Sequence, residues 1–144
     1  MNIVIETHSV KLKSNGNCDI IDITDEIQNL INKLKFIEGN ALIFVVGSTA
    51  ALTTIEYEPG LLKDYPQLFE KLIPSNQNYH HNQTWHDGNG HSHLRASLQK
   101  ASLIVPFKNS KLLIGTWQQI IFVDFDNRPR NREIIVQLTG VKQN

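Results

Sequence analysis

Hydrophobic and polar residues alternate along the first part of the chain, residues 2–12, and again along Cys18–Ile23. Such alternation is typical of strands that bury one face. The polar SNGN sequence at 14–17 between the two segments is typical of a turn. The pattern therefore predicts that the chain opens with a hairpin of two antiparallel strands.

After Ile23 the apolar residues recur at the spacing of a helix. Thr24 supplies a hydroxyl that can cap a helix, and Asp25 and Glu26 supply negative charge where the helix dipole favours it. The apolar positions that share one helical face are Ile27, Leu30, Ile31 and Leu34. We expect a helix that begins at Thr24 and ends near Gly39.

The middle of the chain predicts two further strands and a second helix. The continuous apolar run at 41–46 is typical of a strand covered on both faces, and Gly47 separates it from an extended segment at 48–58. Apolar residues at helical spacing between 61 and 72 predict the helix, in which Pro66 is tolerable only in the first turn.

The last part of the chain predicts a long loop, a short helix and a β-rich end. Residues 75–90 contain almost no apolar side chain, which is typical of a loop. Asn89 can cap a short helix that begins near His91. Three β-rich segments follow at 102–107, 112–125 and 132–139. Together the elements indicate an α+β fold with two or three helices in a single domain of residues 1–144.

Composition and charge narrow the class of protein. The 14 Lys and Arg balance the 14 Asp and Glu, so no excess charge attracts nucleic acid or an anionic membrane over long range. Cys18 is the single cysteine, and the N-terminus lacks a signal-peptide pattern. The longest apolar run, 41–46, is far shorter than the roughly 20 residues of a membrane-spanning helix. We expect a cytoplasmic protein with neither nucleic acid nor membrane as partner.

Five of the six histidines lie in the run YHHNQTWHDGNGHSH, Tyr79–His93. Neutral imidazoles and a carboxylate suit zinc, and three protein ligands plus water are usual at catalytic zinc sites. The candidate metal ligands are His81, His91 and His93, with His86 as a further candidate. His91 and His93 would diverge by roughly 200° on one helix, because residues advance about 100° each. Both could turn inward if the helix began after His93.

Two alternatives to a metal site stay open. The same run could form a metal-free active site, with His81 or His93 as general acid or base and Asp87 beside them. Backbone amides of DGNG at 87–90, together with Asn89 and Arg95, could then hold an anion at the start of a helix. A solvated polar loop is the third possibility.

Other candidates lie outside this run. Glu56 precedes a predicted turn and could accept a proton or orient a histidine, although glutamate is commonly solvated. Arg128 and Arg130 lie in a turn and could converge on a phosphate, since arginine matches phosphate oxygens well. Trp117 is expected in the core or in a subunit interface. P-loop, Rossmann, HExxH and GxSxG motifs are absent.

Several short sequences, taken in order, resemble the YjbQ-like family of small uncharacterised proteins: NYHHN, DGNGHSHLRASL, VPF, GTWQQIIFVDFD, RPRNR and QLTG. The similarity covers about Ala41 to Gly140. The positions that match the family pattern are His81, Asn89, His93 and Gly115–Gln118, which makes Gln118 a further candidate for substrate binding. Many relatives have a histidine where this chain has Gly47, and His86 or His91 is the candidate replacement.

The resemblance implies a sandwich of antiparallel sheets with helices, assembled as a homotrimer with sites near the subunit boundaries. Family members are often labelled secondary thiamine-phosphate synthases, which join a pyrimidine diphosphate to a thiazole phosphate and release pyrophosphate. The leading hypothesis is therefore an enzyme, of the thiamine-phosphate synthase type, that acts on a phosphorylated or anionic small molecule with or without a divalent metal such as zinc. The alternative is a non-catalytic trimer that binds a metal or an anion.

Overall fold

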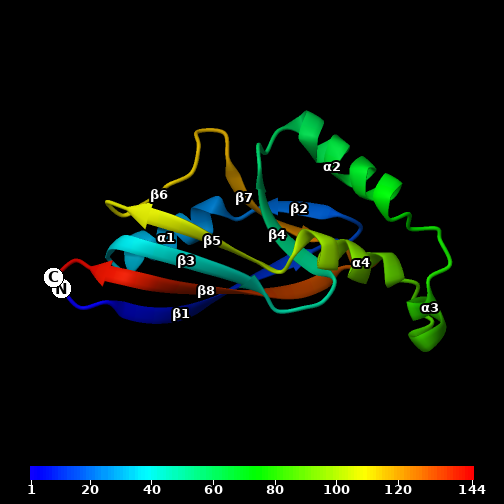
Figure 1. Ribbon diagram of the computed structural model, residues 1–144, viewed down its shortest axis with the longest axis horizontal. Helices are drawn as coiled ribbons and strands as arrows, with labels where there is room; N and C mark the ends of the chain where they lie inside the picture. Colours follow the sequence, from blue (N-terminus) through cyan, green and yellow to red (C-terminus); the bar gives the residue numbers. More distant parts are fainter.

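Eight strands form two antiparallel sheets in the computed structural model, which describes residues 1–144. The larger sheet has the strand order β1 (Val4–Ser14), β8 (Arg130–Lys142), β3 (Phe36–Val45), β5 (Ser102–Lys108) and β6 (Lys111–Leu112). The smaller sheet has the order β2 (Asp19–Asp22), β7 (Gln119–Asp124) and β4 (Ala50–Ile55). The two chain ends lie close together, because Val4 pairs with Gly140 (Figure 1).

The four helices are α1 (Thr24–Lys33), α2 (Pro59–Leu72), α3 (His80–Trp85) and α4 (Gly90–Gln99). A core of 17 buried residues fills the space between the two sheets and α1, and includes Phe36, Ile43 and Phe122. A second core of eight residues lies on the other face of the smaller sheet, where Phe69 of α2 and Ala96 of α4 pack. Helices α2, α3 and α4 therefore gather at one end of the molecule, opposite the chain termini (Figure 1).

The α+β fold with antiparallel sheets agrees with the expectation from sequence, with four helices in place of two or three. The predicted hairpin is wrong in its pairing. Both strands form, but β1 pairs with β8 and β2 pairs with β7. Three successive left-handed residues, Gly16, Asn17 and Cys18, turn the chain out of the larger sheet. The amides of Asn17 and Cys18 then donate to Asp126 and Asp124 carbonyls.

The first helix is shorter than expected. It ends at Lys33, and Lys35 adopts a left-handed conformation (φ 62°) before β3 begins at Phe36. The Thr24 side chain does not cap it. Its hydroxyl donates to Asp22 Oδ1 at 2.6 Å and accepts from the Ile120 amide at 2.8 Å, so it joins the helix start to the smaller sheet.

Two expectations about the middle of the chain are corrected. Helix α2 begins at Pro59, so Pro66 lies inside it and beyond the first turn. The segment 75–90 is not entirely loop, because α3 forms from His80 to Trp85. This helix could not be predicted from the sequence, because none of its residues is buried and it has no apolar face.

The strands near 41–46 and 112–125 also differ from expectation. Strand β3 buries alternate residues and leaves Phe44 45% exposed, so one face is open in the single chain. The GTWQ sequence at 115–118 forms a loop between β6 and β7, not a strand. Trp117 is 72% exposed there, so it is not part of the core. No helix has the length and apolar character needed to span a membrane.

Candidate functional site

Helices α3 and α4 bring the ends of the histidine-rich run together. Helix α3 stops at His86, which is left-handed (φ 58°), and Gly88 is also left-handed (φ 67°). These two residues reverse the chain before α4 starts at Gly90. The Gly90 amide donates to Asn82 Oδ1 at 2.9 Å, and a Cβ at this position would overlap the Tyr79 side chain. The glycine thus permits the close approach of the two helices.

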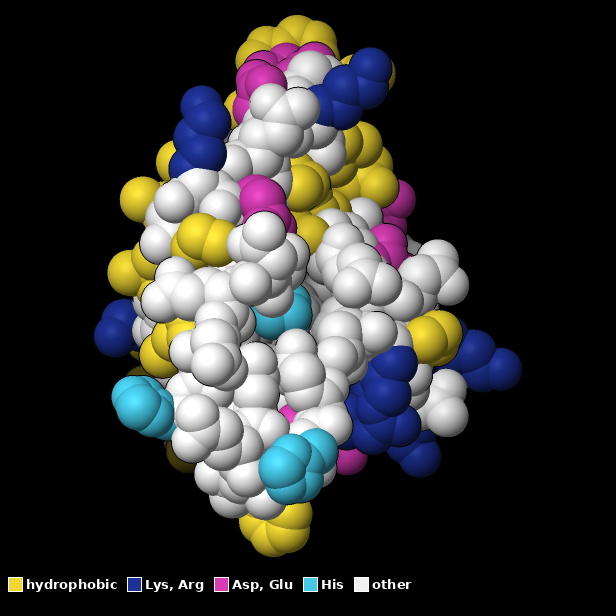
Figure 2. Space-filling view, turned by 90° about the vertical axis from the view of Figure 1, so that its right-hand side faces the viewer, with side chains coloured by type: hydrophobic (Ala, Val, Ile, Leu, Met, Phe, Trp, Pro, Cys, Tyr) yellow, Lys and Arg dark blue, Asp and Glu magenta, His cyan; other side chains and the backbone are white.

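A pair of imidazoles, His81 and His93, is the centre of the candidate site. Their ring centroids are 4.3 Å apart at an interplanar angle of 42°. They line a hollow of about 320 Å³ together with Tyr79, His80, Gly90 and Leu94, which we call the histidine pocket. Figure 2 shows this end of the molecule, with imidazole rings at the surface and one deep in a hollow.

Asp87 lies beside this pair. Its Oδ1 is 3.9 Å from His81 Nδ1, which is buried and has no hydrogen-bond partner. Asn127 Nδ2 donates to the Asp87 carbonyl at 2.7 Å and so holds the loop in place. The Asp87 carboxylate therefore places a negative charge beside the imidazole pair.

Burial favours the neutral form of His93. It lowers the pKa of His93, the nearby His81 imidazole lowers it further, and the Asp126 and Asp87 carboxylates oppose the shift. An imidazole whose pKa is below its usual value is mostly unprotonated at neutral pH, so it can accept a proton or a hydrogen bond.

His91 does not share this pocket. Helix α4 begins at Gly90, before both histidines, so their side chains diverge as helical geometry requires. His91 is 6% exposed, and its Nδ1 has no partner. Burial, and then the Arg95 charge, lower the pKa of His91. His86 is exposed at the end of α3.

The donor set does not fit the expected zinc site within one chain. No three histidine, cysteine or acidic side chains converge as metal ligands would. The geometry instead gives two imidazoles with one carboxylate nearby, and the third predicted ligand, His91, is buried elsewhere. A three-ligand catalytic zinc site needs three donors that converge on one point, and these side chains do not.

Arg95 has a structural role. Its side chain is 6% exposed, and it donates to Glu70 Oε2 at 2.8 Å and to the Ile73 carbonyl at 2.8 and 3.0 Å. The guanidinium thereby joins α4 to the end of α2. Because Nε and Nη2 are both engaged, the arginine has little capacity left for a substrate anion.

Asn89 occupies the N-cap position of α4 without capping it. Its Nδ2 donates to Asp126 Oδ1 at 3.2 Å, while its Oδ1 is buried without a partner. Asp126 is fully buried and also accepts from Thr49 and from Arg130. This aspartate was not among the residues predicted from the sequence, although the VDFD end of a predicted strand shows two acids at alternate positions.

Asp124 and Arg132 complete a buried ionic network with Asp126. Arg132 donates to both carboxylate oxygens of Asp124 at 2.8 Å and to Thr49 Oγ1 at 2.7 Å. Fully buried charges are costly unless paired in this way. The network therefore fixes the start of β8 and the Asp126 carboxylate that holds Asn89.

The remaining candidates lie apart from the imidazole pair. Glu56 is exposed just after β4. Gln118 folds back in its loop, where it donates to Thr54 Oγ1 and accepts from the Gly115 amide. Arg128 is exposed in the turn before β8, and Arg130 pairs with Asp126. None of these four lines the histidine pocket.

Comparisons with known proteins agree with this fold over nearly its whole length. The family model described as UPF0047 protein YjbQ-like matches residues 8–141. A UPF0047 protein of Archaeoglobus fulgidus is 39% identical over 126 residues, which cover 88% of this chain and 95% of that relative. One from Methanocaldococcus jannaschii is 36% identical over 133 residues, covering 92% and 93%.

Solved structures show the same architecture. The crystal structure of a YbjQ-like protein of unknown function from Sulfolobus solfataricus superposes with a TM-score of 0.92 at 30% identity, covering 97% of this chain and 100% of that one. The resemblance inferred from NYHHN, DGNGHSHLRASL and GTWQ is thereby confirmed. The chain belongs to the YjbQ-like UPF0047 family.

Proposed function

We propose that this chain is an enzyme that acts on a phosphorylated or anionic small molecule in the histidine pocket. The observation that carries the proposal is the pairing of His81 and His93, with ring centroids 4.3 Å apart and Asp87 beside His81. Two imidazoles in different surroundings can divide the roles of proton donor and proton acceptor.

The surroundings of the two imidazoles support a division of these roles. We assign His81 the role of proton donor, because the Asp87 carboxylate lies 3.9 Å from its Nδ1. His93 is the proton acceptor, because burial lowers its pKa. The start of α4 adds the positive end of a helix dipole next to His93, which favours a negatively charged group of the substrate. These roles use only the side chains of the pocket and need no metal ligand.

The resemblance names one reaction to assay first, thiamine-phosphate synthesis. A bond forms between a pyrimidine methylene carbon and the thiazole nitrogen, while the bond from that carbon to diphosphate breaks. Pyrophosphate leaves with the electron pair. A protonated His81 would stabilise the departing oxyanion, at the atom where negative charge develops.

The test is turnover by the purified full chain with pyrimidine diphosphate and thiazole phosphate, followed as pyrophosphate release. His81→Ala and His93→Ala should each lower kcat by about 100-fold or more, the usual scale for loss of a general acid or base. His86→Asn is the matched control, because His86 is exposed and asparagine tolerates its left-handed backbone.

Full activity of both alanine variants would rule out this assignment. Binding of the phosphorylated compounds without turnover, lost in the same variants, would show the non-catalytic binding module instead. Glu56→Gln should leave kcat within about twofold of wild type, since its side chain is exposed and outside the pocket.

We also propose that the chain assembles with copies of itself, as the predicted homotrimer. The support is an apolar patch on the open face of the larger sheet, formed by Leu42, Phe44, Val46, Ile104 and Ile135. Phe44 pairs with Ile135 and Leu42 pairs with Ile104 in the sheet register, so the side chains are contiguous. Phe44, Val46 and Ile104 are 45%, 49% and 65% exposed. Contiguous exposed apolar surface of this kind is typical of an interface.

A further inference from the structure

The chain contains two Asn-Gly steps, Asn15-Gly16 and Asn89-Gly90. An asparagine before a glycine can lose its side-chain amide without an enzyme, because the backbone nitrogen of the glycine can attack the asparagine Cγ. Glycine has no Cβ, so it hinders this attack less than any other residue. The reaction requires that the asparagine side chain is free to move over the following peptide bond. The structure places the two asparagines in opposite surroundings.

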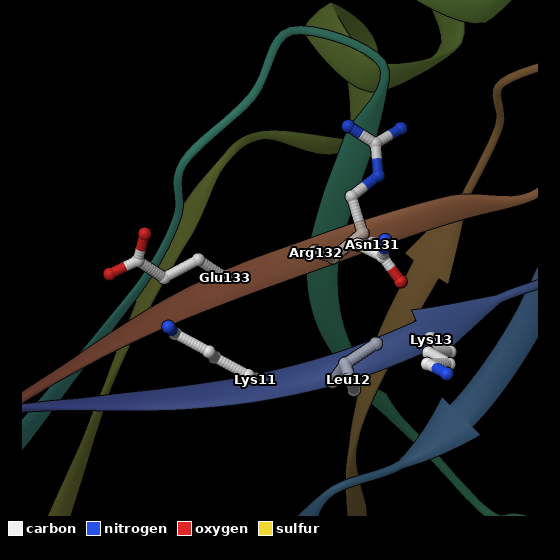
Figure 3. A pocket seen from close by; sticks show the side chains of 6 residues that line it. All are labelled: Lys11, Leu12, Lys13, Asn131, Arg132 and Glu133. Carbon is white, nitrogen blue, oxygen red and sulfur yellow. The ribbon is translucent and has the colours of Figure 1, made fainter.

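Asn15 lies in the turn between β1 and β2, and its side chain is free. The residue is exposed, its side chain makes no hydrogen bond within the chain, and its backbone amide donates to Asp19 Oδ2 at 2.8 Å. Figure 3 shows the end of β1 at Lys13, from which the chain enters this turn. The Gly16 amide donates to the Ser14 hydroxyl at 3.0 Å and makes no backbone hydrogen bond. Both reacting groups are therefore outside the hydrogen-bonded strands.

Asn89 is held at both groups that would have to react. It is 7% exposed, and its Nδ2 donates to the buried Asp126 carboxylate at 3.2 Å. The Gly90 amide donates to Asn82 Oδ1 at 2.9 Å, and Gly90 is the first residue of α4. The buried carboxylate and the start of the helix therefore keep the Asn89 Cγ away from the Gly90 nitrogen.

We propose that Asn15 is a site of spontaneous deamidation, and that Asn89, in the same dipeptide, resists it. The Gly16 nitrogen forms a bond to the Asn15 Cγ, and the bond from Cγ to the side-chain nitrogen breaks. The proton from the Gly16 nitrogen leaves with that amino group as ammonia, and a cyclic imide remains. Water then opens the imide at either carbonyl, which gives aspartate or isoaspartate. No oxidant, metal or enzyme takes part, and the proposal does not depend on the activity assigned to the histidine pocket.

Isoaspartate at this position disturbs the turn, because its backbone is longer by one methylene. Gly16 (φ 75°) lies so close to the β7–β8 turn that an added Cβ would overlap the Arg128 carbonyl oxygen. The next amide, that of Asn17, donates to the Asp126 carbonyl at 2.6 Å. A longer chain before Gly16 shifts both contacts. The new carboxylate also repels Asp19, whose Oδ2 accepts from the amide of the modified residue.

Peptide mass spectrometry of the full chain, after incubation at mildly alkaline pH, tests the proposal. The peptide that contains Asn15 should show the mass change of an amide converted to a carboxyl, and chromatography should separate its aspartate and isoaspartate forms. The peptide that contains Asn89 should keep its amide. In urea both peptides should deamidate at similar rates, because the fold no longer protects Asn89.

Asn15→Gln is the matched variant, since its longer side chain disfavours closure of the ring. It should fold as wild type does, because an exposed side chain without a hydrogen bond is replaced. Its thermal unfolding midpoint should stay constant during incubation, while that of wild type falls as the isoaspartate fraction grows. Freshly prepared Asn15→Asp carries the new charge without the longer backbone and should unfold at a higher temperature than incubated wild type.

The proposal fails if Asn15 keeps its amide in the folded chain, or if Asn89 loses its amide as fast as Asn15 does. It also fails if Asn89 stays intact in urea, because its protection would then not come from the fold. An equal fall of the midpoint in Asn15→Gln would overturn the link between this modification and the turn.

Discussion

The Arg95 guanidinium donates to Glu70 and to the Ile73 carbonyl, and Glu70 in turn accepts from the Ser75 amide at 2.8 Å. At the scale of single residues, these hydrogen bonds hold the segment that leads from α2 into α3 in place. The Ser75 hydrogen bond and the Arg95 side chain hold the pKa of Glu70 at about 2, below its ordinary 4.5. A carboxyl whose pKa is lowered on folding stabilises the native state while it is ionised.

We therefore predict that Glu70→Gln lowers the free energy of unfolding at neutral pH and has little effect near pH 2. Glu70 contributes fully above its unfolded pKa of 4.5, and its contribution is lost as the pH falls toward about 2. Urea unfolding of both proteins across this range measures the difference. A difference that stays constant down to pH 2 would contradict the assignment. Glu58→Gln is unsuitable as a control, because Glu58 caps α2.

The residue types alone were enough to identify the histidine-rich run as a candidate site. They did not predict which residues each of its side chains contacts. His81, Asp87 and His93 are visible in the sequence as a polar cluster, and the structure brings them together. Arg95 looks equally available in the sequence, yet its partner Glu70 comes from a helix 25 residues earlier. Such long-range pairing leaves no local signal, which is why Arg95 was expected to bind substrate.

At the scale of elements, the junction of α3 and α4 decides the shape of the histidine pocket. Gly90 opens α4 where its Cα faces Tyr79 and Asn82 of the preceding segment. Since His81 lies on α3 and His93 on α4, the distance between the two helices sets the distance between the imidazoles.

Gly90→Ala should destabilise the chain by about 1–3 kcal/mol, as overpacking of a close contact usually does. The added Cβ would lie 2.7 Å from Tyr79 Cβ, so the helices must separate. Gly115→Ala is the matched control, because a Cβ there meets its nearest atoms at ordinary contact distance, 3.6 Å. Thermal unfolding compares the two, and equal small effects would contradict a tight α3–α4 contact.

Local patterns identified most strands and three of the helices, but not how the strands pair. Alternation along β1 and β2 is the same whether they pair with each other or with β8 and β7. Asn17 and Cys18, which separate the two strands, are left-handed although they are not glycines, so the sequence did not indicate this change of chain direction. Helix α3 was missed because it is short and polar on every face.

At the scale of the whole molecule, the larger sheet has one face in the core and one face open. On the open face, Phe44 and Ile104 are more exposed than large apolar residues of β strands usually are. The apolar run at 41–46 predicted a strand covered on both sides. The single chain covers one side, and a neighbouring copy would cover the other, so the continuous apolar sequence of β3 is consistent with assembly.

Analytical ultracentrifugation checks this expectation. Wild type should sediment at about three times the 16.4 kDa chain mass, while Phe44→Lys with Ile104→Lys should sediment as a folded monomer, because buried lysines without partners oppose the interface. Leu68→Lys is the control, since Leu68 is an exposed apolar residue of α2 outside the patch. A monomeric wild type would refute the assembly. An oligomer that survives both lysines would place its interface on another face, and Trp117 would then be the residue to replace next.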